Sequence, residues 1–168
     1  RLEPPLGLAR LAVLELVEAF ALTNSAFAFD ALLRSGFMER ALDLFFQYPW
    51  NNFAHQSVSN IVATVLQSPH TDLGVHILGD CRLPERILRA ERASADYKAA
   101  HGCALGYTGH LTSLSLHINK IAEQEPRYRE LLQAQPGWAD YTANVLAPRA
   151  QKEAQLLGGM RPPQQSAL

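Results

Sequence analysis

Residues Phe45–His55 read FFQYPWNNFAH and join two segments that both have helical periodicity. Pro49 ends the first segment, because proline lacks a backbone donor and its ring clashes with the preceding helical turn. Asn52 can cap the next helix through its side-chain oxygen. His55 falls in the first turn of that helix and can hydrogen-bond back across the turn. The stretch is therefore predicted to be a corner between two helices.

The aromatic side chains of this corner leave two interpretations open. Phe45 and Phe46 lie late in a helix, which favours core packing, whereas Tyr48, Trp50 and Phe53 are harder to bury together within one turn. Burial would make the corner structural, and exposure would make it a docking surface, since Trp and Tyr are favoured anchors of protein interfaces. We expect the structural corner and keep the docking surface as the alternative.

Helical periodicity extends over most of the remaining chain. Leu8–Leu22 carries apolar residues around much of its circumference, including Val13, Leu16, Val17 and Phe20 on one face, so we expect it to be buried on more than one side. Further helices are expected from Ser25 to Arg34 with a stop at Gly36, over residues 37–48, 52–67, 71–78 and 84–98, from Thr108 or Gly109 onward, and from Pro126 and Pro136. Strand alternation and hairpin turn signals are missing.

These expectations make the chain all-α. Helix pairs that recur at roughly 30 to 40 residues favour stacked αα-hairpins in an armadillo or HEAT-like repeat, with a compact helical bundle as the alternative. We expect residues 1–157 to form the helical-repeat domain and residues 158–168, which have no apolar pattern, to form a mobile tail. Because the chain begins at Arg1 and enters a helix almost at once, we expect a fragment of a longer protein.

Composition limits the classes of partner. The net charge of −1 disfavours a general polyanion-binding protein. Leu11–Leu22, the longest apolar region, is too short and too often interrupted by glutamate to span a bilayer. Cys81 and Cys103 are expected to be reduced thiols of an intracellular protein, with a disulfide between them as the alternative. The expected location is the cytoplasm, with the nucleus as a second one, and no membrane or nucleic-acid partner is expected.

Motifs for catalysis, phosphate binding and metal binding are missing from the sequence. His110 and His117 are seven residues apart, whereas helical zinc pairs prefer four. No nucleophile elbow or phosphate-binding glycine loop is present. We therefore expect no catalytic residue, no cofactor, no metal and no small-molecule substrate. The alternative is a small helical hydrolase that uses His110 or His55 as a general base.

Four arginines follow one another at spacings of four, three and three, namely Arg82, Arg86, Arg89 and Arg92. This spacing places them along one side of a helix. They could bind carboxylates or phosphates of a partner, and a nucleic-acid-binding module is a further alternative. The preferred interpretation is a solvated face that Glu85 and Glu91 neutralise.

Four stretches, in order, resemble the SAPS family of phosphatase-associated proteins. Leu42–His55, LDLFFQYPWNNFAH, resembles the family signature, and Arg10–Asn24 resembles the helix upstream of it. CRLPERIL at Cys81–Leu88 and GYTGHLT at Gly106–Thr112 resemble two further elements, the second with Thr108 where methionine is usual. Together the matches cover about residues 8 to 146.

The resemblance implies the C-terminal part of an α-helical, armadillo-like scaffold. Such a scaffold is a regulatory subunit that binds the catalytic subunit of serine/threonine-protein phosphatase 6 and directs it to substrates. The residues that we single out as candidates for contact with a partner are Tyr48, Trp50, Asn51, Asn52, His55, Arg82, Arg86, Arg89, Arg92, Tyr107 and His110.

Overall fold

The computed structural model describes residues 5–154, and these residues form helices and turns without a β-strand. The expected tail at residues 158–168 lies outside the described residues. The helices in chain order are α1 (Leu8–Leu22), α2 (Ala26–Ser35), α3 (Phe37–Gln47), α4 (Asn52–Gln67), α5 (Thr71–Leu78), α6 (Leu83–His101), α7 (Thr108–Ala122), α8 (Pro126–Ala134), α9 (Trp138–Tyr141), the π-helical segment η1 (Thr142–Leu146) and α10 (Ala147–Glu153). The all-α prediction is confirmed.

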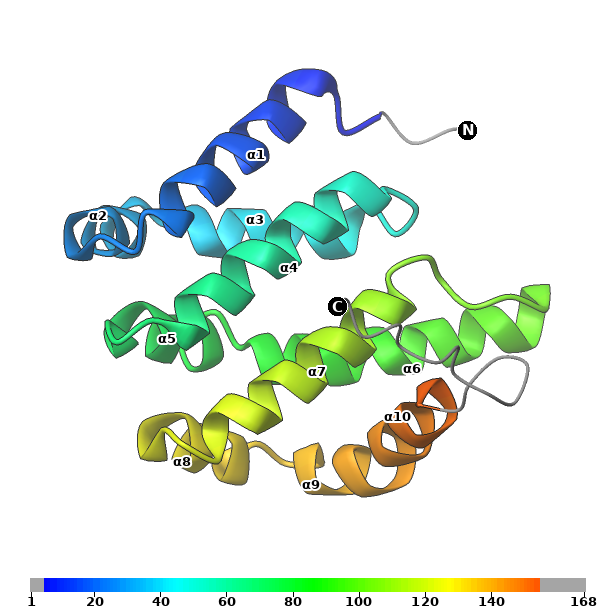
Figure 1. The fold of residues 1–168 in the computed structure, drawn as a ribbon. Helices are drawn as coiled ribbons and strands as arrows, with labels where there is room; N and C mark the ends of the chain where they lie inside the picture. Colours follow the sequence, from blue (N-terminus) through cyan, green and yellow to red (C-terminus); the bar gives the residue numbers. More distant parts are fainter. Residues whose placement is uncertain (1–4, 155–168) are drawn as a thin grey trace, which may run out of the picture.

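The helices stack in repeated layers (Figure 1). The long helices α1, α4 and α7 lie side by side, and α4 contacts both of the others. The short helices α2, α5 and α8 form a second row in which α5 contacts both neighbours. Each unit therefore has three helices rather than the expected pair, and its long helix begins at residue 8, 52 or 108. The repeat unit is longer than expected because a short helix intervenes in each one.

Local signals placed most helix ends correctly. α1 and α5 have the expected bounds, and Gly36 ends α2 with a φ of 66°, a conformation that glycine adopts without strain. α6 runs three residues beyond the expected Lys98, because only Gly102 breaks the helix after two alanines. Near the C-terminus the last helix begins at Trp138 and not at Pro136.

That last helix continues through the wider π turn η1 into α10. Pro148 lies in the first turn of α10 and has no backbone N–H to donate. A π turn directly before a proline accommodates the missing hydrogen bond and the bulk of the ring. Residues 138–153 therefore form one bent helix, which is longer than the short helix expected from Pro136.

The core follows the predicted apolar faces of the central helices. On α4 it takes in Val58, Ile61, Val62 and Val65, which are fully buried. Apolar residues of α3 and the start of α7 are also buried, namely Met38, Ala41, Leu42, Phe45, Leu111, Leu114 and Ile118. Helices with neighbours on both sides thus bury the faces that their periodicity indicates.

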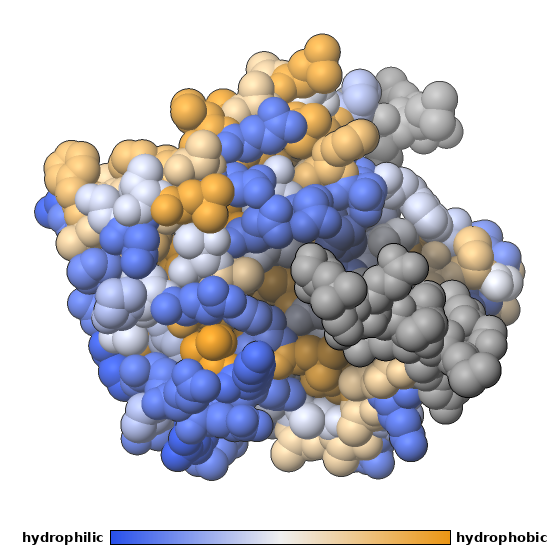
Figure 2. Space-filling model, viewed as in Figure 1, coloured by the Kyte–Doolittle hydropathy of each residue, from blue (hydrophilic) through white to orange (hydrophobic). Residues whose placement is uncertain are grey.

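The first helix departs from the prediction. Only Leu14 and Ala21 of α1 are buried, and Val13, Leu16 and Phe20 face solvent. Helix α1 has α4 on one side only, so its outer surface remains uncovered within the described residues. Hydrophobic residues consequently gather over α1 and α2 at the upper end of the molecule (Figure 2). The expected burial on more than one side is therefore wrong.

Candidate functional site

The corner between α3 and α4 is built as a tight turn. The Asn51 backbone N–H donates to the Tyr48 carbonyl at 3.0 Å, and the Asn51 side chain accepts from the Ala54 N–H at 3.1 Å. Asn51 and not Asn52 is therefore the N-cap, which satisfies one of the free donors at the start of α4. Asn52 instead begins the helix and reaches α7, where the His110 Nε2–H donates to its Oδ1 at 2.8 Å.

Trp50 stands on the outside of this corner with 59% of its surface exposed. Its ring meets the edge of Tyr97 on α6 at 5.9 Å between centroids, and Tyr97 in turn stacks on His101 at 4.0 Å. A Cβ at Gly106 would lie 2.6 Å from the Pro49 carbonyl oxygen and 3.1 Å from the Trp50 ring. The loop before α7 can approach the corner this closely only because residue 106 is glycine. Trp50 is thus held from two sides while its ring remains exposed.

Beneath the corner lies a buried aromatic cluster. His55 is fully buried, and its ring lies 4.7 Å from Phe45, 6.0 Å from Tyr107 and 5.4 Å from His110. The His55 Nε2–H donates to the Phe45 carbonyl at 3.1 Å, which confirms the predicted bond back across the turn. Burial, and then the neighbouring His110, lower the pKa of His55 to about 4. His55 is therefore neutral at pH 7 and serves the core.

Tyr107 belongs to the same cluster, buried and stacked on Phe45 at 6.2 Å. Burial raises the pKa of Tyr107, and Glu91 adds to the increase. Among the candidate residues of the corner, His55 and Tyr107 therefore lie below the surface, whereas Trp50, Asn51 and Asn52 lie at it or close to it. The corner thus combines a structural interior with an exposed exterior, so both interpretations from the sequence describe part of it.

The arginine row is largely paired within the chain. Arg86 donates to Asp43 of α3 at 2.6 Å, and Arg89 donates to Glu85 at 2.7 Å. Arg82 also approaches Glu85, at 3.9 Å. Arg82 adopts a φ of 52° and precedes α6. The four arginines therefore do not all lie on one helix. Arg92 is exposed.

A cleft of about 570 Å³ borders three of these arginines, and four carboxylates share it: Glu39, Asp43, Asp80 and Glu85. The mixed charge supports the solvated, neutralised face and gives no continuous basic surface for nucleic acid.

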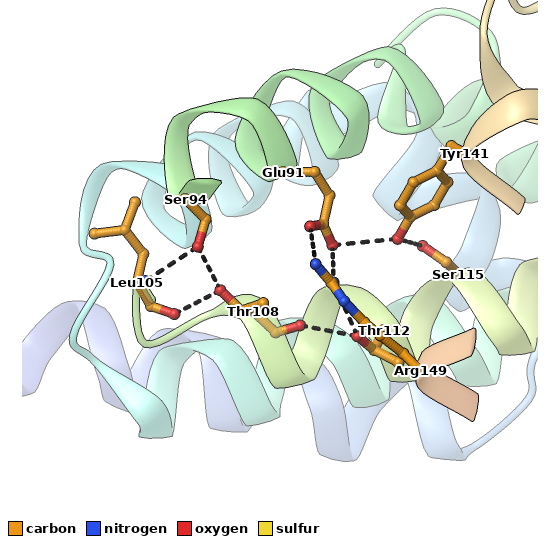
Figure 3. Close-up of polar contacts among 8 residues, drawn as sticks. All are labelled: Glu91, Ser94, Leu105, Thr108, Thr112, Ser115, Tyr141 and Arg149. Carbon is orange, nitrogen blue, oxygen red and sulfur yellow. Dashed lines mark hydrogen bonds and ion pairs between the residues drawn. The ribbon is translucent and has the colours of Figure 1, made fainter. Parts of the chain in front are cut away.

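Glu91 does not neutralise that row, contrary to the prediction. It is nearly buried, and Arg149 of α10 donates to its two oxygens at 2.7 and 2.8 Å. Tyr141 also donates to it at 3.3 Å and is hydrogen-bonded to Ser115 at 3.1 Å (Figure 3). The network attaches α10 to α6 and α7, so Glu91 has a structural role.

Sequence reasoning did not identify Tyr97, His101 and Gly106 as parts of the exposed corner. They lie about fifty residues after Trp50 in the chain. Tyr97 and Gly106 contact Trp50, and His101 stacks on Tyr97, only because the chain folds back on the corner. Phe53 was noted as hard to bury but was not proposed for partner contact, and 71% of its surface is exposed. The sequence indicated this exposure, because Phe53 lies on the polar face of the helical pattern of α4.

Residues 5–154 contain no group of three side chains suited to a metal ion. None of their helices has the length and apolar character required to cross a bilayer. Cys81 is a buried free thiol, and its pKa is raised to about 11, first by burial and then by Glu39. Cys103 is an exposed free thiol, so the alternative of a disulfide between the two is not formed.

Comparison with known proteins gives consistent family matches. The profile of the SAPS family, described as SIT4 phosphatase-associated protein, matches residues 26–155. Human serine/threonine-protein phosphatase 6 regulatory subunit 1 is 34% identical over 165 residues, which cover 87% of this chain and 19% of that protein. Chicken serine/threonine-protein phosphatase 6 regulatory subunit 3 is 34% identical, with 74% of this chain and 16% of that protein covered.

A yeast relative extends the comparison. SIT4-associating protein SAP190 of Saccharomyces cerevisiae is 30% identical, and the match covers 74% of this chain and 13% of that protein. The chain thus spans about a fifth or less of the length of these relatives. No solved structure matches the chain significantly.

Proposed function

The chain belongs to the SAPS family of SIT4 phosphatase-associated proteins, and we propose that it forms part of a non-catalytic regulatory subunit that binds a phosphatase 6-type catalytic subunit and directs it to substrates. The observation that carries the proposal is the family match over residues 26–155, which includes the whole aromatic corner. Three relatives, from human, chicken and yeast, are named for regulation of such a phosphatase or for association with it.

The architecture supports a binding role. Stacked helices of this kind expose long side surfaces that suit protein partners. On one such surface Trp50 is exposed yet held against Tyr97 and the Gly106 loop, so little side-chain freedom remains to be lost on binding. Phe53 lies exposed in the first turn of α4 beside it. We assign the contact with the catalytic subunit to these two rings.

A co-purification experiment tests this assignment. The immobilised chain should retain a phosphatase 6-type catalytic subunit, and a Trp50→Ala/Phe53→Ala variant should retain at least tenfold less, because exposed aromatic anchors dominate many interfaces. Phe27→Ala is the matched control, since Phe27 is exposed to 74% on α2 and belongs to another surface. Failure of the wild type to retain the enzyme would contradict the proposal, and equal retention by the double variant would contradict the assigned surface.

The non-catalytic part of the proposal has its own test. The purified chain should not hydrolyse a phosphopeptide or a generic ester. Burial lowers the pKa of His110, and its Nε2–H is already donated to Asn52, so the ring is held in place without a nucleophile identified beside it. Hydrolysis that disappears in a His110→Ala variant would show instead that the chain is an enzyme.

A further inference from the structure

A groove of about 560 Å³ runs between α4 and α7 on the face where these helices lie side by side. One wall is a row of three side-chain amides on α4, which we call the amide row: Asn52, Gln56 and Asn60. The opposite wall carries polar side chains of α7, His110, Ser113 and His117. The groove is thus lined by hydrogen-bonding groups. Neither the family match nor the aromatic corner assigns these groups a role.

The spacing of the amide row matches an extended polypeptide. Residues four apart on a helix are about 6 Å apart along its axis. One edge of an extended chain presents a backbone N–H and C=O pair every two residues, or about every 6.7 Å. From Asn52 to Asn60 the row covers about 12 Å along the helix, which corresponds to about four extended residues. A peptide that runs along the groove can therefore meet successive amides with successive exposed backbone groups.

Hydrogen bonds within the protein hold the row in position. Gln56 Nε2 donates to Asn60 Oδ1 at 2.9 Å, and Asn60 Nδ2 donates to Glu18 of α1 at 2.6 Å. Asn52 Oδ1 accepts from His110 at 2.8 Å. Among the described residues these bonds leave the Asn52 amide nitrogen and the Gln56 amide oxygen without partners. An ordered donor and an ordered acceptor thus remain for a C=O and an N–H of the bound chain.

The remaining surroundings of the groove indicate which peptide fits. Ala63 and Leu114 contribute apolar surface, and the Ser59 hydroxyl beside them is buried without a hydrogen-bond partner. Gly106 closes one end, where it lies directly against the exposed Trp50 ring. A side chain that leaves the groove at this end can pack on the indole.

The charges around the groove also indicate which net charge a bound peptide can carry. Among the described residues, Glu153 lines the groove, Glu18 pairs with its far amide, and no lysine or arginine lines it. An acidic or phosphorylated segment would therefore meet like charge and no cation, whereas a neutral or basic segment is favoured.

We propose that the groove between α4 and α7 binds an extended, neutral to basic peptide segment of a partner protein, through the amide row and an apolar side chain packed on Trp50. This goes beyond binding of the catalytic subunit, because it assigns the chain a second ligand of a defined conformation and charge, which would share the Trp50 ring with the catalytic subunit. A linear segment of this kind offers a regulatory subunit a means to select substrates or further partners.

Selection from a phage-displayed library of random linear dodecapeptides tests the proposal without any phosphatase. The immobilised chain should enrich peptides that are poor in Asp and Glu and contain an apolar residue. An Asn52→Ala/Gln56→Ala variant should bind the enriched peptides at least about tenfold more weakly, because two hydrogen bonds are lost. Gln133→Ala is the control, since Gln133 is an exposed amide of α8 that does not line the groove.

Tryptophan emission supplies a second measurement. The chain has two tryptophans, and Trp138 is buried, so an emission change on peptide binding that is absent in Trp50→Phe reports the groove end. If the double variant loses its helical circular dichroism signal, Gln56→Ala alone, at an exposed position, should still weaken binding about threefold. No enrichment, enrichment of acidic peptides, or binding that is insensitive to Gln56 would overturn the proposal. None of these outcomes bears on whether the phosphatase is bound.

Discussion

At the corner between α3 and α4, a side chain can be exposed to solvent and still be held in one position by its neighbours. Trp50 is fixed by contacts with Tyr97 and with the loop at Gly106, although most of its ring faces solvent. His55 is in the opposite situation, because it is a polar ring that is enclosed by aromatic neighbours and keeps one bond to a backbone carbonyl. Each residue has a consequence for stability that can be measured.

Trp50→Ala should lower the free energy of unfolding by less than about 1 kcal/mol. The ring contributes little to the core because 59% of its surface is already in water, whereas a buried tryptophan would cost about 3–5 kcal/mol. Urea unfolding followed by circular dichroism measures the difference. A loss in the range of a buried ring would show that the corner is structural throughout.

Stability should fall by about 2 kcal/mol between pH 7 and pH 5 because of His55. The pKa of this ring is about 4 in the folded protein and 6.5 in the unfolded chain, so the unfolded state takes up more protons as the pH falls below 6.5. The stabilisation is therefore complete above pH 6.5 and is lost as the pH falls toward 4. The lowered pKa of the neighbouring His110 acts in the same direction.

Urea unfolding across this pH range measures the effect. A His55→Leu variant should be less stable at pH 7 but should lose less stability on acidification. The control Gln56→Ala, which replaces an exposed neighbour of His55 that does not titrate, should keep the wild-type pH dependence. A wild-type protein that is equally stable at pH 5 and pH 7 would refute the assignment.

At the scale of the helices, packing depends on where small residues allow close approach. Helix α5 contacts α8 in the row of short helices, and Tyr128 of α8 is buried there against Gly74 of α5. The Tyr128 hydroxyl donates to the Thr71 carbonyl at 3.4 Å. The two helices thus approach through a glycine that helix propensity alone would disfavour.

Gly74→Ala should destabilise the protein by about 1–3 kcal/mol, because the added methyl group would collide with the buried Tyr128 phenol. Gly109→Ala provides the control within α7. No atom lies within 4 Å of its added Cβ, so the better helix propensity of alanine should leave stability unchanged or raise it by up to about 1 kcal/mol. Thermal or urea unfolding distinguishes the two, and equal effects would contradict the proposed contact.

At the scale of the whole molecule, the two ends of the stack differ. The α8 end presents polar residues to solvent, including Arg127, Arg129, Glu130 and Gln133. The α1 end presents an apolar surface, visible at the top of Figure 2. Exposed apolar patches of this kind tend to associate.

The chain should therefore self-associate through α1 at micromolar concentration. Leu16→Glu places a charge on the exposed apolar face, where Leu16 is exposed to 69%, and should shift the protein to the monomer in sedimentation velocity. Phe53→Glu, at an equally exposed apolar position on α4, should leave the association unchanged. If the wild-type protein is monomeric at all concentrations, the predicted self-association through α1 is wrong.

The sequence by itself determined the helices, most of their ends and the corner, because these depend on residues within one or two turns: the 3.6-residue period, Pro49, Gly36 and a cap near Asn51. It also identified the family, since the signature residues are contiguous. It misjudged α1, because periodicity reports how much of a helix is apolar but not whether a neighbour covers it.

Only the tertiary structure decided the pairing of Glu91 with Arg149, the contact of Trp50 with Tyr97 and Gly106, and the groove between α4 and α7. The residues in each contact are separated by about fifty positions or more in the chain. Their proximity results from the stacking of whole helices, and no local pattern encodes which side chains then meet.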